Sequence, residues 1–178
     1  VANSVIPFFV LWYLAYRSLE VGYWLTLLLT IPAAGFMVRM FIIFHDCCHG
    51  SFFESKLAND RMGLLLGAAV WTPYYNWKHS HAIHHATAGD LDRRGIGDVY
   101  TMTVEAYLAS PWYKKVGYRI MRNPFILFTI GATIVFVIAH RFWDTGAGKR
   151  EKNSVIWTNL ALLAFVGWSI NLIGWRAY

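Results

Sequence analysis

Histidines gather in one stretch of this 178-residue sequence. Six of the seven histidines lie between positions 45 and 85, in the clusters HDCCH and HSHAIHH. In a helix, residues four apart share one face, so His45 and His49 are predicted to point the same way. The second cluster repeats this spacing, at i, i+3 and i+4, with His81, His84 and His85. Each cluster can therefore aim several imidazoles at one point.

Clustered imidazoles are typical of a metal site. Imidazole binds Fe, Cu, Zn and Ni, and geometry selects among these metals. Five or more neutral ligands exceed what one four-coordinate zinc ion needs, so the pattern favours two metal ions. A single H-x-x-x-H would be a weak signal, whereas two clusters in one region are a stronger one. Asp46 is predicted either to orient a histidine by accepting its second ring N–H or to be a solvated carboxylate at a helix end.

The elements that must position these clusters are membrane helices. Hydrophobic residues make up 57% of the chain and aromatic residues 17%, unlike an average soluble protein. A helix of about 20 apolar residues crosses the ~30 Å hydrocarbon core of a bilayer. The sequence therefore predicts an all-α integral membrane protein with about four transmembrane helices. Its single domain, 1–178, comprises a first hairpin (4–16 and 21–38), a helical cytoplasmic metal-binding region (44–123) and a second hairpin (124–139 and 155–173).

Charge indicates the surroundings of this region. The formal net charge is +6, and the basic residues are spread along the chain instead of forming runs. This spread favours anionic membrane lipids or an acidic electron-transfer partner over nucleic acid. The basic region 44–123 predicts a cytoplasmic face for both histidine clusters, whereas four basic residues between 141 and 153 weigh against that orientation.

Two segments carry a resemblance to a known family. FIIFHDCCHGSFF at 41–53 and WKHSHAIHHATAGDLDRRGIGD at 77–98 closely resemble the first and second histidine boxes of the membrane fatty acid desaturases. The likeness is strongest to bacterial acyl-lipid omega-6 (delta-12-type) enzymes and runs from about residue 21 to residue 107. It implies metal ligands at His45, His49, His81, His84 and His85. Asp46 and His79 are expected beside the ligands without binding the metal. For His79, a position at the surface is the alternative.

The sequence departs from the family pattern in two places. Cys48 stands where relatives often have Gly, which changes packing but no ligand. The family's third histidine box is absent from these 178 residues, and His140, alone at a predicted helix end, cannot replace it. Because the chain also starts at Val1 and stops at Tyr178 in an apolar stretch, we expect it to be truncated and inactive by itself.

The resemblance implies a di-iron oxidoreductase of a bacterial inner membrane. The complete enzyme would hold two non-haem Fe ions and take electrons from ferredoxin or a cytochrome b5-like donor. It would use O2, reduced to water, to place a cis double bond in an acyl chain carried by a lipid, CoA or a carrier protein. The protein fixes which carbon approaches the metal. The segment WTPYYNW at 71–77 is predicted either to line an apolar acyl tunnel or to be an interfacial aromatic segment.

Two alternatives stay open. A related di-iron membrane hydroxylase or ketolase has similar histidine boxes, although the match in HAIHHATAGDLDRRG favours desaturation. A non-catalytic metal-binding membrane protein, such as a zinc or nickel transporter, commonly has its ligands inside spans near the midplane. The histidines here lie outside the predicted spans, which favours an enzyme.

Overall fold

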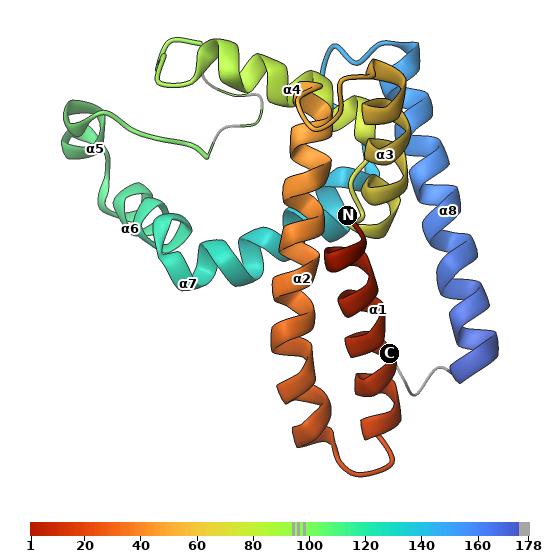
Figure 1. Cartoon of the computed structure of the whole chain (residues 1–178). Helices are drawn as coiled ribbons and strands as arrows, with labels where there is room; N and C mark the ends of the chain where they lie inside the picture. Colours follow the sequence, from red (N-terminus) through yellow and green to blue (C-terminus); the bar gives the residue numbers. More distant parts are fainter. Residues whose placement is uncertain (94, 96, 98, 175–178) are drawn as a thin grey trace. The chain divides into compact units, whose positions relative to one another are not determined.

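The computed structural model describes residues 1–93, 95, 97 and 99–174, and the described chain is helical (Figure 1). No β-strand occurs among these residues, which confirms the predicted all-α class. Arg94, Ile96 and Asp98, near the end of the second resemblance segment, lie outside the described residues. In chain order the elements are α1 (Ala2–Ser18), α2 (Tyr23–His49), α3 (Lys56–Ala69), α4 (Tyr74–Thr87), α5 (Val104–Ala109), α6 (Trp112–Arg122), α7 (Pro124–Ile126), the π-helical η1 (Leu127–Gly131) and η2 (Ile134–Ile138), the short 3-10 helix η3 (Ala139–Arg141), and α8 (Lys149–Ile173).

The chain divides into two compact units. Unit 1 comprises residues 1–74 and 156–178, and unit 2 comprises residues 75–155. The boundaries fall after the first residue of α4 and within α8. The first histidine cluster therefore belongs to unit 1 and the second to unit 2.

Three stretches among the described residues are long and apolar enough to cross a membrane. They are Tyr23–His49, Pro124–Arg141 and Lys149–Leu172. Each contains all or most of one predicted span. The remaining predicted span, 4–16, lies within α1, which has 17 residues and is shorter than these three. The structure thus provides three candidate spans where the sequence predicted about four.

Helix α2 continues past the predicted end of its span. The span was predicted to end at Val38 because Arg39 marks the membrane interface, but the helix runs on to His49. Arg39 stays helical, with its guanidinium carbon 5.5 Å from the centroid of the Phe36 ring. A charge limits how deep a segment sits in lipid, but it leaves the backbone hydrogen bonds of the helix intact. The first histidine cluster is therefore the end of a helix that is long enough to cross the membrane.

The core of unit 1 forms where α2 packs against α3. Phe44 of α2 is fully buried and meets the ring of Tyr74 edge-on, with 5.9 Å between the ring centroids. Gly63 of α3 allows this packing, because a Cβ at that position would collide with the Tyr74 ring. The absence of a side chain at Gly63 therefore lets Tyr74 reach the interior.

Unit 2 joins the start of α4 to the loop before α8. The side-chain amide of Asn76 donates to Asp144 Oδ2 (2.9 Å), and the backbone N–H of Asp144 donates to Asn76 Oδ1 (3.2 Å). The backbone N–H of Tyr75 donates to Ser154 Oγ (3.0 Å), and the Arg150 guanidinium lies 3.7 Å from the centroid of the Tyr75 ring. These contacts fix the first turn of α4 within its unit.

The same contacts locate the basic loop at 141–153. Because Asp144 bonds to Asn76, this loop lies beside the start of the helix that carries the second histidine cluster. Three of the four basic residues, Lys149, Arg150 and Lys152, belong to the start of α8, and the cytoplasmic orientation of the cluster stays a prediction. If 124–139 and 155–173 each crossed the membrane, the segment that joins them would lie on the face opposite residues 44–123. The pairing of 124–139 with 155–173 as a hairpin therefore stays a prediction.

Replacing Gly63 by Ala should lower the unfolding temperature, since overpacking a well-filled core costs about 1–3 kcal/mol. Gly35→Ala is the matched control: a Cβ there meets no heavy atom of the described residues within 4 Å, and Ala is favoured over Gly in helices by ~1 kcal/mol. Thermal unfolding in detergent, followed by helical circular dichroism, measures both variants. Equal effects would contradict the close packing of Tyr74 on α3.

Candidate metal centre

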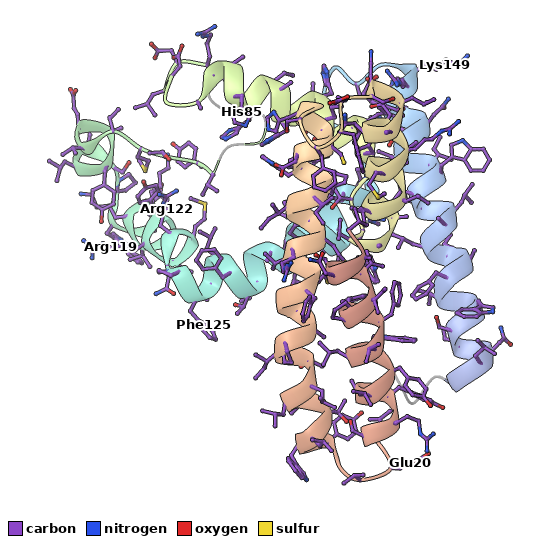
Figure 2. The ribbon with its side chains drawn as sticks, in the orientation of Figure 1. Glu20, His85, Arg119, Arg122, Phe125 and Lys149 are labelled. Atoms are coloured by element: carbon purple, nitrogen blue, oxygen red, sulfur yellow. The ribbon has the colours of Figure 1, made fainter. Side chains whose placement is uncertain are left out.

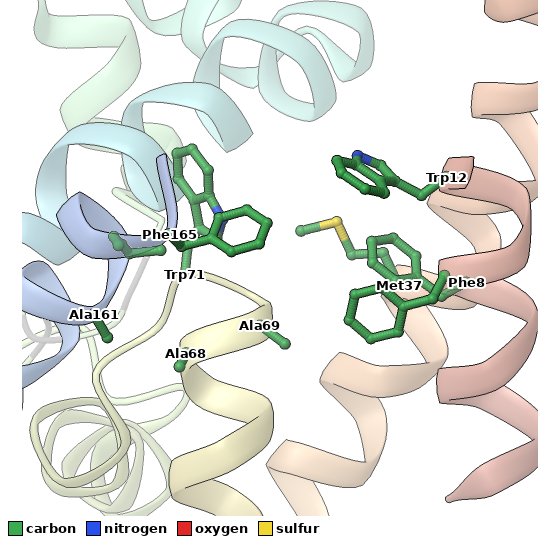
Figure 3. Close-up of a pocket in the computed structure, with 10 residues that line it drawn as sticks. Phe8, Trp12, Met37, Ala68, Ala69, Trp71, Ala161 and Phe165 are labelled. Carbon is green, nitrogen blue, oxygen red and sulfur yellow. The ribbon is translucent and has the colours of Figure 1, made fainter. Parts of the chain in front are cut away.

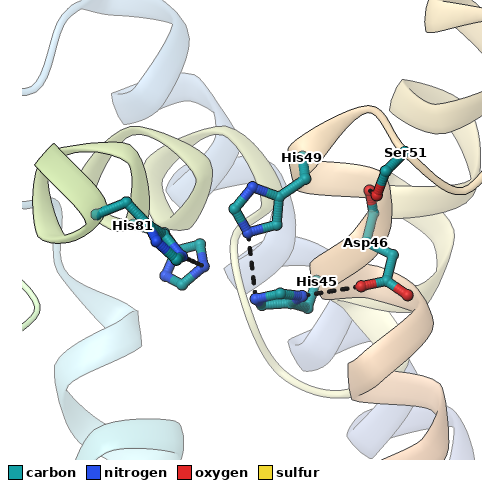
Figure 4. Close-up of polar contacts among 6 residues, drawn as sticks. His45, Asp46, His49, Ser51 and His81 are labelled. Atoms are coloured by element: carbon teal, nitrogen blue, oxygen red, sulfur yellow. Dashed lines mark hydrogen bonds and ion pairs between the residues drawn. The ribbon is translucent and has the colours of Figure 1, made fainter.

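The first histidine cluster presents two imidazoles from the last turns of α2. His45 and His49 are four residues apart, and their Nε2 atoms lie 3.2 Å from each other (Figure 4). His45 is half-buried and His49 is exposed. Two ligand nitrogens from one helix thus converge on one point, as the i, i+4 spacing predicted.

Asp46 fixes the orientation of one of these rings. Its Oδ1 lies 3.0 Å from His45 Nδ1 (Figure 4). A carboxylate that accepts a hydrogen bond from Nδ1 favours the tautomer with its proton on Nδ1. A carboxylate in this position holds an imidazole in the tautomer that binds a metal. The hydrogen bond is the one predicted from the sequence, while its role toward a metal stays a prediction.

A glycine ends the helix immediately after the second of these histidines. Gly50 has a left-handed backbone conformation, with φ of 71°. Its N–H donates to the Cys47 carbonyl (3.1 Å) and the Ser51 N–H donates to the Asp46 carbonyl (3.0 Å), which is the Schellman pattern of a helix end. Ser51 adds a side-chain bond from Oγ to the same Asp46 carbonyl (3.1 Å). His49 is therefore held in the last turn, where its ring is exposed.

A buried tyrosine supports this helix end from inside unit 1. The Tyr74 hydroxyl lies 2.8 Å from Asp60 Oδ1 and 3.0 Å from the backbone oxygen of Cys47, and it shares its single proton between the two acceptors. Tyr74 is 1% exposed, and Asp60 is also buried. Burial, and then the hydrogen bond to Asp60, raise the pKa of Tyr74 above its ordinary value. Cys47 lies between the two ligand candidates in sequence, so this contact holds the turn that carries them.

The second histidine cluster repeats the arrangement within unit 2. His81 and His85 of α4 have their Nε2 atoms 3.1 Å apart. The His84 ring lies near both, with ring centroids 6.0 Å from His81 and 5.7 Å from His85. The indole of Trp77 stacks on His81 with the ring centroids 4.1 Å apart. One helix face therefore collects three imidazoles, and an aromatic ring orients one of them.

His79 lies apart from this group on α4. It is two residues from His81, and two residues correspond to a rotation of about 200° around a helix. Its ring is half-buried. The structure thus separates His79 from the face formed by the other three histidines of its cluster.

Unit 1 also contains an apolar pocket of about 450 Å³ (Figure 3). Aromatic residues of α1, small residues of α3 and apolar residues of α8 line it. The lining residues are Phe8, Phe9, Trp12, Met37, Ala68, Ala69, Trp71, Ala161, Leu162 and Phe165. A lining without charged or strongly polar groups suits a hydrocarbon chain.

Of the predicted lining segment 71–77, Trp71 contributes to this pocket and Tyr74 does not. Trp71 has a positive φ of 59°, which is unusual for a residue with a side chain. Tyr74 is instead committed to the contact with Cys47 and Asp60. Sequence reasoning missed Asp60, because a carboxylate in an unremarkable helix gives no signal until a partner from another element is seen.

Comparison with known proteins agrees with the histidine motifs. A family model described as fatty acid desaturase matches residues 22–178. A protein of Bacillus subtilis named fatty acid desaturase is 49% identical over 176 residues, which cover 99% of this chain and 50% of that protein.

Two further relatives are more distant. The sn-1 acyl-lipid omega-3 desaturase (ferredoxin) of Synechocystis is 30% identical over 143 residues, covering 77% of this chain and 38% of that protein. An oleoyl-12-hydroxylase of Ricinus communis is 31% identical over 99 residues, covering 56% of this chain and 24% of that protein. The chain spans about half the length, or less, of these curated relatives. No solved structure matches it.

Replacing Tyr74 by Phe should cost about 1–3 kcal/mol at neutral pH, because the buried Asp60 carboxylate and the Cys47 carbonyl lose the hydrogen bonds from the Tyr74 hydroxyl. The raised pKa adds a pH signature. The folded protein favours the neutral phenol, so the stabilisation is complete below the unfolded-state pKa of ~10 and is lost as pH rises through the folded-state pKa. Part of the alkaline loss of stability should therefore be missing in Tyr74→Phe.

Denaturant titrations in detergent across this pH range measure both effects. Tyr113→Phe, which alters an exposed tyrosine of α6, is the control and should change neither. Identical alkaline profiles for the wild type and Tyr74→Phe would contradict the assignment.

Proposed function

This chain belongs to the fatty acid desaturase family, and on that premise we propose that the intact protein is a membrane di-iron desaturase placing a cis double bond in an acyl chain, at the delta-12 (omega-6) position. The observation that carries the proposal is the convergence of histidine Nε2 atoms within each cluster. Each pair, His45 with His49 and His81 with His85, offers two nitrogens toward one point.

The chemistry of these donors fits iron. Imidazole nitrogens are suitable ligands for non-haem iron, and the proposed ligands are His45, His49, His81, His84 and His85. When bound, the two iron ions would supply the reduction of O2 to water that is coupled to removal of two hydrogens from neighbouring methylenes. The third histidine box implied by the family resemblance does not occur in these 178 residues.

The chain's own side chains would prepare this site. Asp46, 3.0 Å from His45 Nδ1, would hold the proton on Nδ1 and direct Nε2 toward the metal. Trp77 fixes the plane of the His81 ring by stacking. Ligands that are oriented before the metal binds lose less freedom on binding, and the resulting geometry is more precise.

The substrate and the electron donor are proposed from the relatives. The Synechocystis protein is named as an acyl-lipid desaturase that uses ferredoxin, so we propose an acyl chain of a membrane lipid and ferredoxin here. The alternative acyl carriers are CoA and a carrier protein, and the alternative electron donor is a cytochrome b5-like protein. The apolar pocket of unit 1 is the proposed site for part of the acyl chain.

A bacterial inner membrane, with the metal centre on the cytoplasmic face, is the proposed location. Arg150, at the start of α8, lies over the Tyr75 ring in the first turn of α4, and the basic helix α6 belongs to the same unit. Positive residues collected near the histidine helix follow the tendency of cytoplasmic segments.

Hydroxylation is the second candidate reaction. It is favoured by the similarity to the oleoyl-12-hydroxylase of Ricinus communis, which covers 56% of this chain. Both reactions begin with removal of a hydrogen from a methylene, so the ligand set alone does not separate them. The product does.

Each of the five proposed ligands should be required for iron. Replacing any one by Ala in the intact protein is expected to remove most of the bound iron and the activity, whereas Asp46→Ala should weaken iron binding about 10–100-fold. His79→Ala is the matched control, since His79 lies on the same helix but apart from the other three rings. Elemental analysis of purified variants measures the metal. Equal loss of iron in His79→Ala would contradict the assignment.

Fatty acids of a host that expresses the intact protein test the reaction and the pocket together. We expect a new cis double bond at delta-12 in the wild type, and a preference for shorter chains in Ala161→Leu because the larger side chain fills the pocket. Ala34→Leu, at an exposed position of α2, should leave chain length unchanged.

Gas chromatography with mass spectrometry locates the new group. A hydroxylated product would show that the protein catalyses hydroxylation, the second candidate reaction, instead of desaturation. A double bond at delta-9 would overturn the proposed position. An unchanged chain-length profile in Ala161→Leu would remove the pocket from the proposal.

A further inference from the structure

Helix α6 has two chemically different faces. At about 100° per residue, its large apolar and aromatic side chains fall on one side: Trp112, Tyr113, Val116 and Ile120. Its basic side chains fall on the other: Lys114, Lys115, Arg119 and Arg122. None of these residues belongs to the proposed metal centre.

The apolar face of α6 is exposed. Trp112 is 76% exposed and Ile120 is 55% exposed. A continuous apolar face of this kind normally marks a surface that binds another apolar surface. The neighbouring sequence shows which surface this is, because Asn123 alone separates α6 from Pro124, the first residue of a candidate membrane span.

Asn123, directly after α6, caps the start of that apolar segment. The Asn123 side chain accepts hydrogen bonds from the backbone N–H groups of Phe125 (3.0 Å) and Ile126 (3.4 Å). Phe125, the first large side chain after the turn, is 74% exposed (Figure 2). The exposed apolar surface therefore continues from α6 into a segment that is apolar enough for a bilayer.

The basic face borders a second pocket, of about 420 Å³. Arg119 and Arg122, which Figure 2 labels, are part of its lining. The other lining residues are Met102, Thr103, Val104, Tyr107 and Tyr118. The Tyr107 hydroxyl has no hydrogen-bond partner among the described residues. The Arg119 guanidinium carbon lies 5.8 Å from the centroid of the Tyr107 ring. Two guanidinium groups beside hydroxyl groups match the oxygen atoms of a phosphate.

We infer that α6 lies in the surface of an anionic bilayer, with its apolar face in the interfacial layer and Arg119 and Arg122 on phospholipid headgroups. Amphipathic helices with basic and aromatic residues bind such surfaces through apolar burial and charge attraction together. Binding of an acidic protein would explain only the basic side chains of α6. It would leave the exposed Trp112 and Ile120 unexplained, so the lipid surface is the occupant that both faces favour.

The depth of α6 tests this inference without reference to the reaction. Nitroxide labels at Ile120→Cys and Lys114→Cys, in the intact protein reconstituted into bilayers with phosphatidylglycerol, report exposure to oxygen in the lipid and to a nickel chelate in water. The unsubstituted protein, whose Cys47 and Cys48 are buried, provides the background. We expect the Ile120 label to favour oxygen and the Lys114 label to favour the chelate. Equal exposure of both labels to the chelate would overturn the inference.

The headgroup contact has its own measurement. Native mass spectrometry compares the phosphatidylglycerol and phosphatidylcholine retained by the protein. The double variant Arg119→Gln with Arg122→Gln should lower the preference for phosphatidylglycerol about tenfold, given the strength of basic residues near an anionic surface. The matched control, Lys56→Gln with Lys149→Gln, removes two exposed charges elsewhere and should retain the preference.

An unchanged lipid preference in the arginine variant would overturn the headgroup assignment. If that variant also lost binding to an acidic ferredoxin, the basic face would belong to a protein partner instead.

Discussion

The hydroxyl of Tyr74 makes the contact on which the arrangement of unit 1 depends. It is buried, and it satisfies both the Cys47 carbonyl in the last turns of α2 and the Asp60 carboxylate of α3. A buried carboxylate without a donor is costly, so α2 and α3 are held in the one register that brings both to the tyrosine. Gly63 is part of the same constraint, because a side chain there would exclude the ring. The helix end that carries His45 and His49 is fixed by these contacts.

The two histidine clusters illustrate how much of the proposed metal centre is local. Within α2 and within α4, residues four apart meet because the helix repeats every 3.6 residues. Neighbours in the same segment add further contacts: Asp46 lies 3.0 Å from His45 Nδ1, Trp77 stacks on the His81 ring, and Gly50 ends the helix after His49. Within each unit, the positions of the proposed ligands therefore follow from one short segment.

The surface of the chain is consistent with lipid. Apolar side chains that a soluble protein would bury are exposed on α2, α6 and α8, and the unit 1 pocket is lined by hydrocarbon and aromatic groups. Basic residues lie on α6 and at the start of α8 (Lys149, Arg150 and Lys152), both in unit 2. An acyl-lipid substrate, an apolar pocket and a basic helix at the bilayer surface would all belong to one environment.

The sequence by itself determined the all-α class, three of the apolar spans, the two histidine clusters and the membership of the desaturase family. These features depend on composition and on spacing within a helix, which are visible along the chain. The tertiary structure alone decided that Tyr74 is a buried anchor instead of a pocket residue, that Asp60 is its partner, and that the loop at 141–153 lies beside α4. The physical reason is that hydrogen bonds such as Tyr74 to Asp60 and Asn76 to Asp144 join residues from different elements. No local pattern encodes which polar side chain will be buried against which partner, because that choice is made by packing.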